Sequence, residues 1–64
     1  MIGPMRTEGP RADLVAKLHE LAEGWWHLGK DQLADASRAG AERLQGGDTS
    51  IQVGHTEYVV TDEA

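Results

Sequence analysis

The chain has 64 residues, which is enough for one domain and places it near the lower size limit of independent folding. Six basic residues against eleven acidic ones give a formal charge of −5, which argues against sequence-independent nucleic-acid binding through many phosphate contacts. Because the chain contains no cysteine, neither a disulfide nor a thiolate metal site can reinforce the core, and we expect a reducing, cytoplasmic compartment.

The first nine residues lack hydrophobic periodicity and include Gly3, Pro4 and Gly9, so we expect a flexible N-terminal tail over 1–9. This segment has no apolar stretch of the kind found in a secretory signal. No apolar run in the chain approaches the roughly 20 residues that span a bilayer, and we expect no membrane partner. Arginine outnumbers lysine four to two, which is typical of a prokaryotic, GC-rich genome.

The strongest periodic pattern predicts a helix over about residues 10–28. Large apolar residues recur at intervals of four, three, four and three, at Leu14, Leu18, Leu21, Trp25 and Leu28. We expect this stripe to face the core. Gly24 interrupts the pattern, because glycine costs about 1 kcal/mol relative to alanine inside a helix. It either ends the helix as a cap or stays helical with a neighbouring backbone packed against it.

A second helix is predicted over about residues 31–45, with Asp31 as its N-cap. Its inward face is unusually small and holds Leu33, Ser37, Gly40, Ala41 and Leu44. Such a face accommodates large side chains without separating the two helices. We therefore expect an indole of the first helix to lie against it.

After the second helix the hydrophobic period changes to two, which predicts a hairpin over about residues 49–62. Gly54 and His55 fit a type II′ turn, which places Val53 opposite Thr56; a turn at His55 and Thr56 is the alternative. Either turn keeps one core-facing set, namely Ile51, Val53, Tyr58 and Val60. The predicted fold is α+β, a single domain over 10–62 with two antiparallel helices and a C-terminal hairpin (ααββ), followed by an acidic tail end at 63–64.

The predicted function is that of a small non-catalytic interaction or regulatory protein, acting as a homo-oligomer, a homodimer above all, or bound to a larger protein. In so small a chain the gain from burial nearly equals the loss of conformational entropy, so association would supply missing burial. The candidate partner-binding residues lie in the tryptophan pair and on the hairpin, where edges are open to pairing: Trp25, Trp26, Tyr58 and Val59. Neither serine, Ser37 or Ser50, lies in a nucleophile-elbow context, and we expect no enzyme activity.

An alternative interpretation is a helix-turn-helix regulator with residues 31–43 as the recognition helix. The side chains available for phosphates and base edges would be Lys30, Gln32, Arg38 and Arg43. This helix carries a small net negative charge, so we favour a protein partner over nucleic acid.

A third hypothesis is metal binding by His19, Glu23 and His27, which are spaced four residues apart on the first predicted helix. Three side chains spaced along a straight helix do not converge on one ion. These three also lie largely on the side of the helix opposite the apolar stripe. We therefore expect neither a metal site nor a cofactor.

Overall fold

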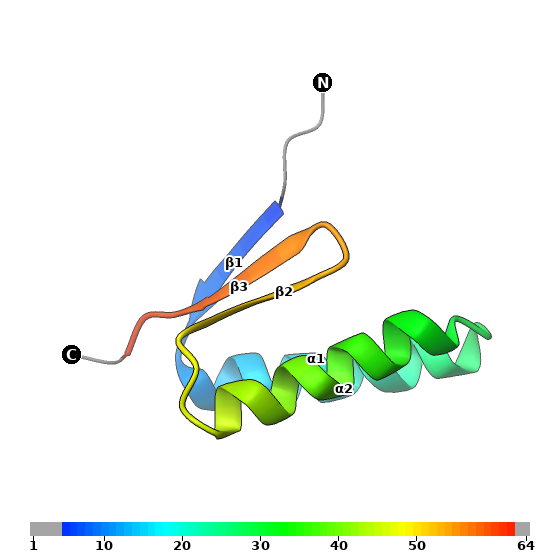
Figure 1. The fold of residues 1–64 in the computed structure, drawn as a ribbon, viewed down its shortest axis with the longest axis horizontal. Coiled ribbons are helices and arrows are strands. Elements are labelled where there is room, and N and C mark those ends of the chain that lie inside the picture. Colours follow the sequence, from blue (N-terminus) through cyan, green and yellow to red (C-terminus); the bar gives the residue numbers. More distant parts are fainter. Residues whose placement is uncertain (1–4, 63–64) are drawn as a thin grey trace.

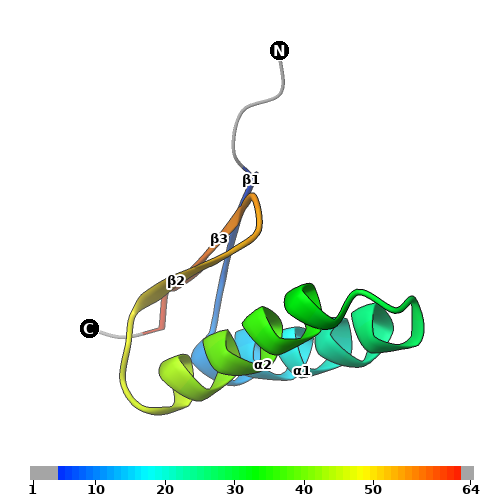
Figure 2. The ribbon, with the colours of Figure 1, turned by 45° about the vertical axis from the view of Figure 1, so that its right-hand side comes forward.

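The computed structural model describes residues 5–62 and has five elements of secondary structure. In chain order these are β1 (Met5–Gly9), α1 (Arg11–His27), α2 (Asp31–Gln45), β2 (Ser50–Val53) and β3 (Thr56–Val60). The two helices form an antiparallel pair on one side of a three-stranded sheet (Figures 1 and 2). This arrangement confirms the predicted α+β class, both helices and the C-terminal hairpin. No helix within residues 5–62 is both long enough and apolar enough to cross a membrane.

Strand β1 is a correction to the sequence prediction, which assigned residues 1–9 to a flexible tail. Residues 1–4 and the predicted tail end at 63–64 lie outside the described part of the chain. Residues 5–9, however, pair in parallel with β3, and the strand order is β1-β3-β2. The segment carries no alternating apolar pattern because it is an edge strand with charged side chains on its open face. Its position depends on a pairing with β3, far along the chain.

The hairpin has the register that the sequence predicted. Val53 lies opposite Thr56, and Ile51 lies opposite Tyr58. Gly54 has a φ of +60°, and no described residue other than glycine has a positive φ. Because a type II′ turn needs positive φ only at its first central position, the turn is at Gly54 and His55. We expected both edges of the hairpin to be open, but β1 covers the β3 edge, so within residues 5–62 only the β2 edge of the hairpin stays unpaired.

The core lies where the N-terminal half of α1, the C-terminal half of α2 and the sheet meet. Leu18 and Leu44 are fully buried there, against the inward side chains of the hairpin. The Arg11 guanidinium donates to the carbonyl oxygens of Leu44 and Asp48, the latter at 2.8 Å. These bonds tie the start of α1 to the last turn of α2 and to the loop that follows it, and the Leu44 carbonyl also accepts from the Gly47 N–H at 3.2 Å.

Gly40 allows α2 to approach β2 closely. A Cβ atom added there would lie 2.8 Å from Cδ1 of Ile51 and 3.2 Å from Cγ2 of Val53. At this point the small face of α2 therefore accommodates the sheet, and not the indole that we expected.

The helix ends also differ from the prediction in two details. Gly24 stays helical, but an added Cβ would meet no atom within 4 Å, so no neighbouring backbone explains it. Lys30, not Asp31, occupies the N-cap position of α2, and no side chain caps that end. Asp31 is the first helical residue, where its negative charge favours the positive end of the helix dipole.

Candidate functional site

The sheet and the helix pair meet at one end of the molecule and diverge toward the other (Figures 1 and 2). At the closed end the chain passes from β1 into α1 and from α2 into β2. At the open end the hairpin turn and the turn between the helices stand apart. Between them lies a pocket of about 340 Å³, here called the helix–sheet cleft. Its walls are formed by Leu21, Trp25, Leu33, Ser37, Val53, Gly54, His55, Thr56 and Tyr58.

The chemistry of the helix–sheet cleft is mainly apolar. None of its lining residues is Asp, Glu, Lys or Arg. The Ser37 hydroxyl donates to the carbonyl oxygen of Leu33 at 2.8 Å, so this polar group is satisfied within its own helix. Burial raises the pKa of the Tyr58 phenol, because the charged phenolate is disfavoured away from water. The cleft is therefore suited to an apolar group, and its volume lies at the lower end of the range of about 300–1,000 Å³ for ligand pockets.

The predicted partner-binding residues do not form one surface. Trp25 is half-buried and lines the helix–sheet cleft, whereas Trp26 is 60% exposed. Tyr58 is only 4% exposed and belongs to the core, so it offers little surface to a partner. Val59 is half-buried on the opposite face of the sheet, in the central strand rather than at an edge. The structure thus brings together Trp25 and Tyr58 alone.

The apolar stripe of α1 is buried over only part of its length. Leu14 and Leu18 lie in the core, Leu21 and Trp25 are half-buried, and Leu28 is 69% exposed. The helix pair extends beyond the region where the sheet lies against it (Figure 1), so Leu28 at the end of the stripe stays largely exposed. The prediction that the whole stripe faces the core is therefore correct only for its first half.

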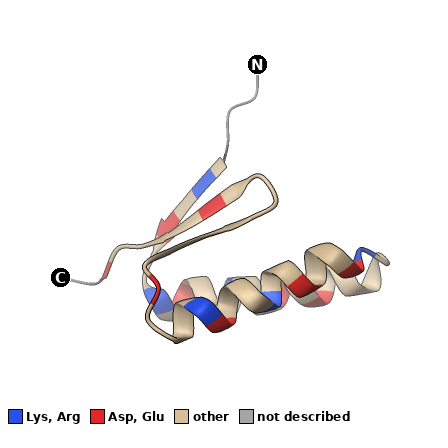
Figure 3. Ribbon diagram, in the orientation of Figure 1, with Lys and Arg blue, Asp and Glu red and all other residues tan. Residues whose placement is uncertain are grey.

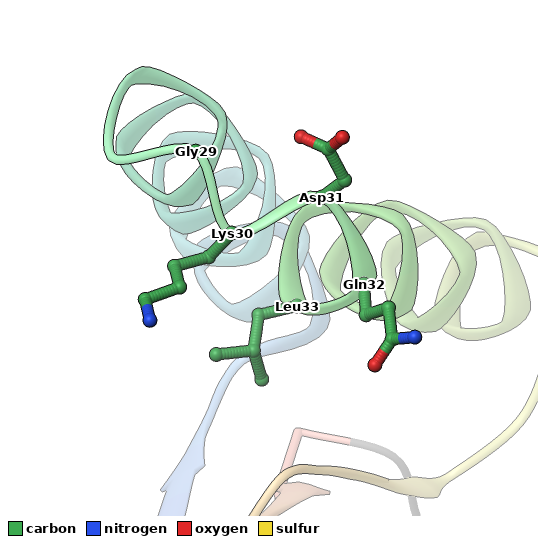
Figure 4. A pocket seen from close by; sticks show the side chains of 5 residues that line it. All are labelled: Gly29, Lys30, Asp31, Gln32 and Leu33. Carbon is green, nitrogen blue, oxygen red and sulfur yellow. The ribbon is translucent and has the colours of Figure 1, made fainter.

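A second hollow, also of about 340 Å³, lies at the turn between the helices and is lined by residues 29–33. Figure 4 shows Leu33 pointing toward the sheet, whereas Lys30 and Asp31 point in different directions. Their charges do not converge on one point. Leu33 therefore connects this hollow to the helix–sheet cleft, which it also lines.

The residues considered for nucleic-acid binding are dispersed along α2. Lys30 and Gln32 lie at its start, and Arg38 lies in its middle. Near its end, Arg43 forms an ion pair with Asp48, with 2.9 Å between Nε and Oδ2. Basic and acidic residues are interspersed over the helices (Figure 3). These four residues do not form a basic surface.

The residues considered for metal binding are also separated. His19 and Glu23 border a hollow that Arg38 shares, whereas His27 does not line it. Across residues 5–62, no group of three or more histidine and carboxylate side chains is placed to hold a metal ion.

Sequence reasoning missed the surface contributed by β1. Met5 is 64% exposed and shares the helix-facing side of the sheet with its register partner Thr56. The charged side chains of Arg6 and Glu8 on either side of Thr7 were the available signal, because charged side chains are common on the edge strand of a sheet.

Comparisons with protein-family models, with curated proteins and with solved structures find no match to this chain.

Proposed function

We propose that this chain is a small, non-catalytic, cytoplasmic interaction or regulatory protein that acts as a homo-oligomer or bound to a larger protein. One observation carries the proposal: apolar surface remains open at one end of the domain. Among the described residues, the exposed large hydrophobic side chains are Met5, Trp26 and Leu28, at 64%, 60% and 69% exposure.

The energetics of a small domain support this proposal. A chain of this size has little surplus stability. The large apolar side chains that the monomer leaves in water are therefore a sizeable part of the apolar surface that association could still bury. Tryptophan is enriched among the residues that dominate binding energy, and Trp25 and Trp26 both lie near the open end. The helix–sheet cleft, which lies between Trp25 and the hairpin, adds an apolar recess. A partner that covers this end would bury surface that the domain alone leaves exposed.

A second copy of the chain is the first occupant to test, because most soluble oligomers are symmetric assemblies of one chain. Sedimentation velocity of the intact protein should show a mass that rises above the 6.9 kDa of the monomer as concentration increases. The range should extend to about 100 µM, which covers association of micromolar strength. A folded monomer throughout would overturn the homo-oligomer and leave only a larger protein as the partner.

Acrylamide quenching of tryptophan fluorescence, measured over the same concentrations, locates the contact. Both tryptophans lie in the last turns of α1, at positions 25 and 26. Quenching that falls as the protein associates would place this end in the contact between copies. Quenching that does not change would leave this end free for a larger protein.

A further inference from the structure

The outer edge of β1 presents backbone groups that no strand within residues 5–62 pairs with. The Met5 N–H donates to the carbonyl oxygen of His55 at 3.0 Å, and the Gly9 carbonyl accepts from the Thr61 N–H at 2.9 Å. In a strand, the N–H and C=O of one residue point to the same side, and the side alternates along the chain. The backbone groups of Arg6 and Glu8 therefore point away from β3 and toward the open edge.

The side chains of Arg6 and Glu8 lie on the face of the sheet opposite the helices. Their neighbour Thr7 lies beside Tyr58, whose side chain faces the core, so residues 6 and 8 point to the other face. Both are about half exposed, and Nε of Arg6 lies 2.7 Å from Oε2 of Glu8. Figure 3 shows one basic and one acidic position in succession along β1. The open edge thus carries opposite charges two residues apart.

We propose that β1 pairs with β1 of a second copy, antiparallel, about a two-fold axis that passes between the two Thr7 residues. This inference rests on the self-association proposed above and names its surface. In this register Arg6 lies opposite Glu8 of the second copy, and Glu8 lies opposite its Arg6. Both are hydrogen-bonded pairs, because the backbone groups of residues 6 and 8 face the edge. The result is one continuous sheet that contains the three strands of each copy.

Charge complementarity selects this arrangement. Opposite charges directly across an antiparallel pair are favourable, and like charges are unfavourable. An edge with charge of one sign would repel its own copy, which is a common protection against such pairing. The edge of β1 carries one charge of each sign, placed symmetrically about Thr7. An antiparallel copy therefore matches both charges at once.

The side chains on the helix-facing side agree with the same register. Met5 lies opposite Gly9 of the second copy, so a large exposed side chain meets a residue without one. A Cβ at Gly9 would lie 3.9 Å from Cδ2 of Leu14, so the Met5 side chain would be close to the core of the second copy. The pairing thus covers apolar surface that is 64% exposed in the monomer.

The other edge of the sheet, β2, is less suited to this role. Val60 N–H donates to the Thr49 carbonyl at 2.8 Å, so the backbone groups that face outward from β2 are those of Ser50 and Gln52. Neither residue is charged, so this edge offers no charge complementarity.

The decisive experiment uses the variants Arg6→Glu and Glu8→Arg in the full chain, alone, combined and mixed. Each single variant places like charges across both pairs of its own homodimer, so we expect its self-association to weaken at least about tenfold at low salt. The double variant restores opposite charges and should associate like the parent. The equimolar mixture of the two single variants should also associate, because the heterodimer pairs opposite charges at both positions.

The mixture distinguishes the effect of losing charge pairs between copies from the effect of losing the ion pair within one strand. In both single variants the pair between residues 6 and 8 of the same chain stays broken, so only a contact between chains can restore association. Thermal unfolding at low concentration verifies that each variant folds. Asp35→Arg and Arg38→Glu are matched charge reversals on exposed positions of α2, and they should leave association unchanged.

Two results would overturn the inference, and they have different consequences. If the parent stays monomeric, both this surface and the proposed homo-oligomer are wrong. If the parent associates but the single variants associate equally well, or their mixture does not recover, only the β1 edge is wrong. The copies then meet through another surface, and the proposed function stands.

Discussion

The closed and open ends of this domain are built from the same two helices and the same hairpin, yet only the closed end has a core. At the closed end, Leu14, Leu18 and Leu44 are buried against the sheet. At the open end, Leu28 belongs to the same stripe as Leu14 and is 69% exposed. Hydrophobic periodicity identifies the face of a helix that can be buried, but the direction of the neighbouring layer decides how much of that face is buried.

The largest expected effect comes from Leu18→Ala at the closed end. Leu18 is 0% exposed, so truncation removes buried methyl groups and leaves a cavity, which destabilises by about 2–5 kcal/mol. Leu28→Ala, at the exposed end of the same stripe, should change stability by less than about 0.5 kcal/mol. Urea unfolding of both variants measures the difference. Equal losses would mean that the open end is covered after all.

A smaller loss is expected from Arg11→Met, which keeps most of the apolar stem of the side chain and removes the guanidinium group with its charge. The guanidinium of Arg11 bonds the carbonyl oxygens of Leu44 and Asp48, and hydrogen bonds of a charged donor contribute about 1.5–3 kcal/mol. The matched control is Arg43→Met, which removes the exposed ion pair with Asp48 and should cost less than about 1 kcal/mol. If chemical denaturation ranks the two variants in the opposite order, Arg11 does not hold the closed end together.

The two helical glycines should respond with opposite signs. Gly24→Ala adds a methyl group where no atom lies within 4 Å, so it should stabilise by about 1 kcal/mol through helix propensity. Gly40→Ala forces a Cβ to within 2.8 Å of Ile51, and this overpacking should outweigh the same propensity gain and destabilise by about 1 kcal/mol. Melting temperatures of the two variants, measured beside the parent, test the signs. A stabilising Gly40→Ala would show that α2 can move away from β2 at little cost.

The sequence predicts those helices and strands that are specified by the residues within them and next to them. Both helices follow from their periodicity, and the hairpin register follows from Gly54 and the alternating residues after it. Strand β1 has no such local information, because residues 5–9 become a strand only by pairing with residues 56–60. Pairings between distant segments depend on the whole fold rather than on strand propensity.

The candidate site was predictable only in part, for a related reason. Trp25 could be selected from the sequence because its residue type is common at binding surfaces and its position ends an apolar stripe. The helix–sheet cleft itself depends on the angle between the two layers, which no local pattern encodes. Tyr58 illustrates the limit: alternation correctly places it on the core face, and the same burial removes it from the surface proposed for a partner.

The smallest expected effect is a pH dependence at Tyr58, where the core meets the helix–sheet cleft. Burial raises the pKa of this phenol above its ordinary value of 10.0, because the charged phenolate is disfavoured away from water. In the unfolded chain the phenol ionises first as the pH rises, so its contribution to stability is complete below about pH 10 and is lost through the higher folded pKa. Since Tyr58 is the only tyrosine, phenolate absorbance titrates this one group, and its midpoint should be higher in native protein than in denaturant. Tyr58→Phe should show a shallower alkaline loss of stability than the parent. Equal midpoints in native and denatured protein would mean that water reaches this ring freely. Tyr58 would then belong to the open end of the domain and not to the core.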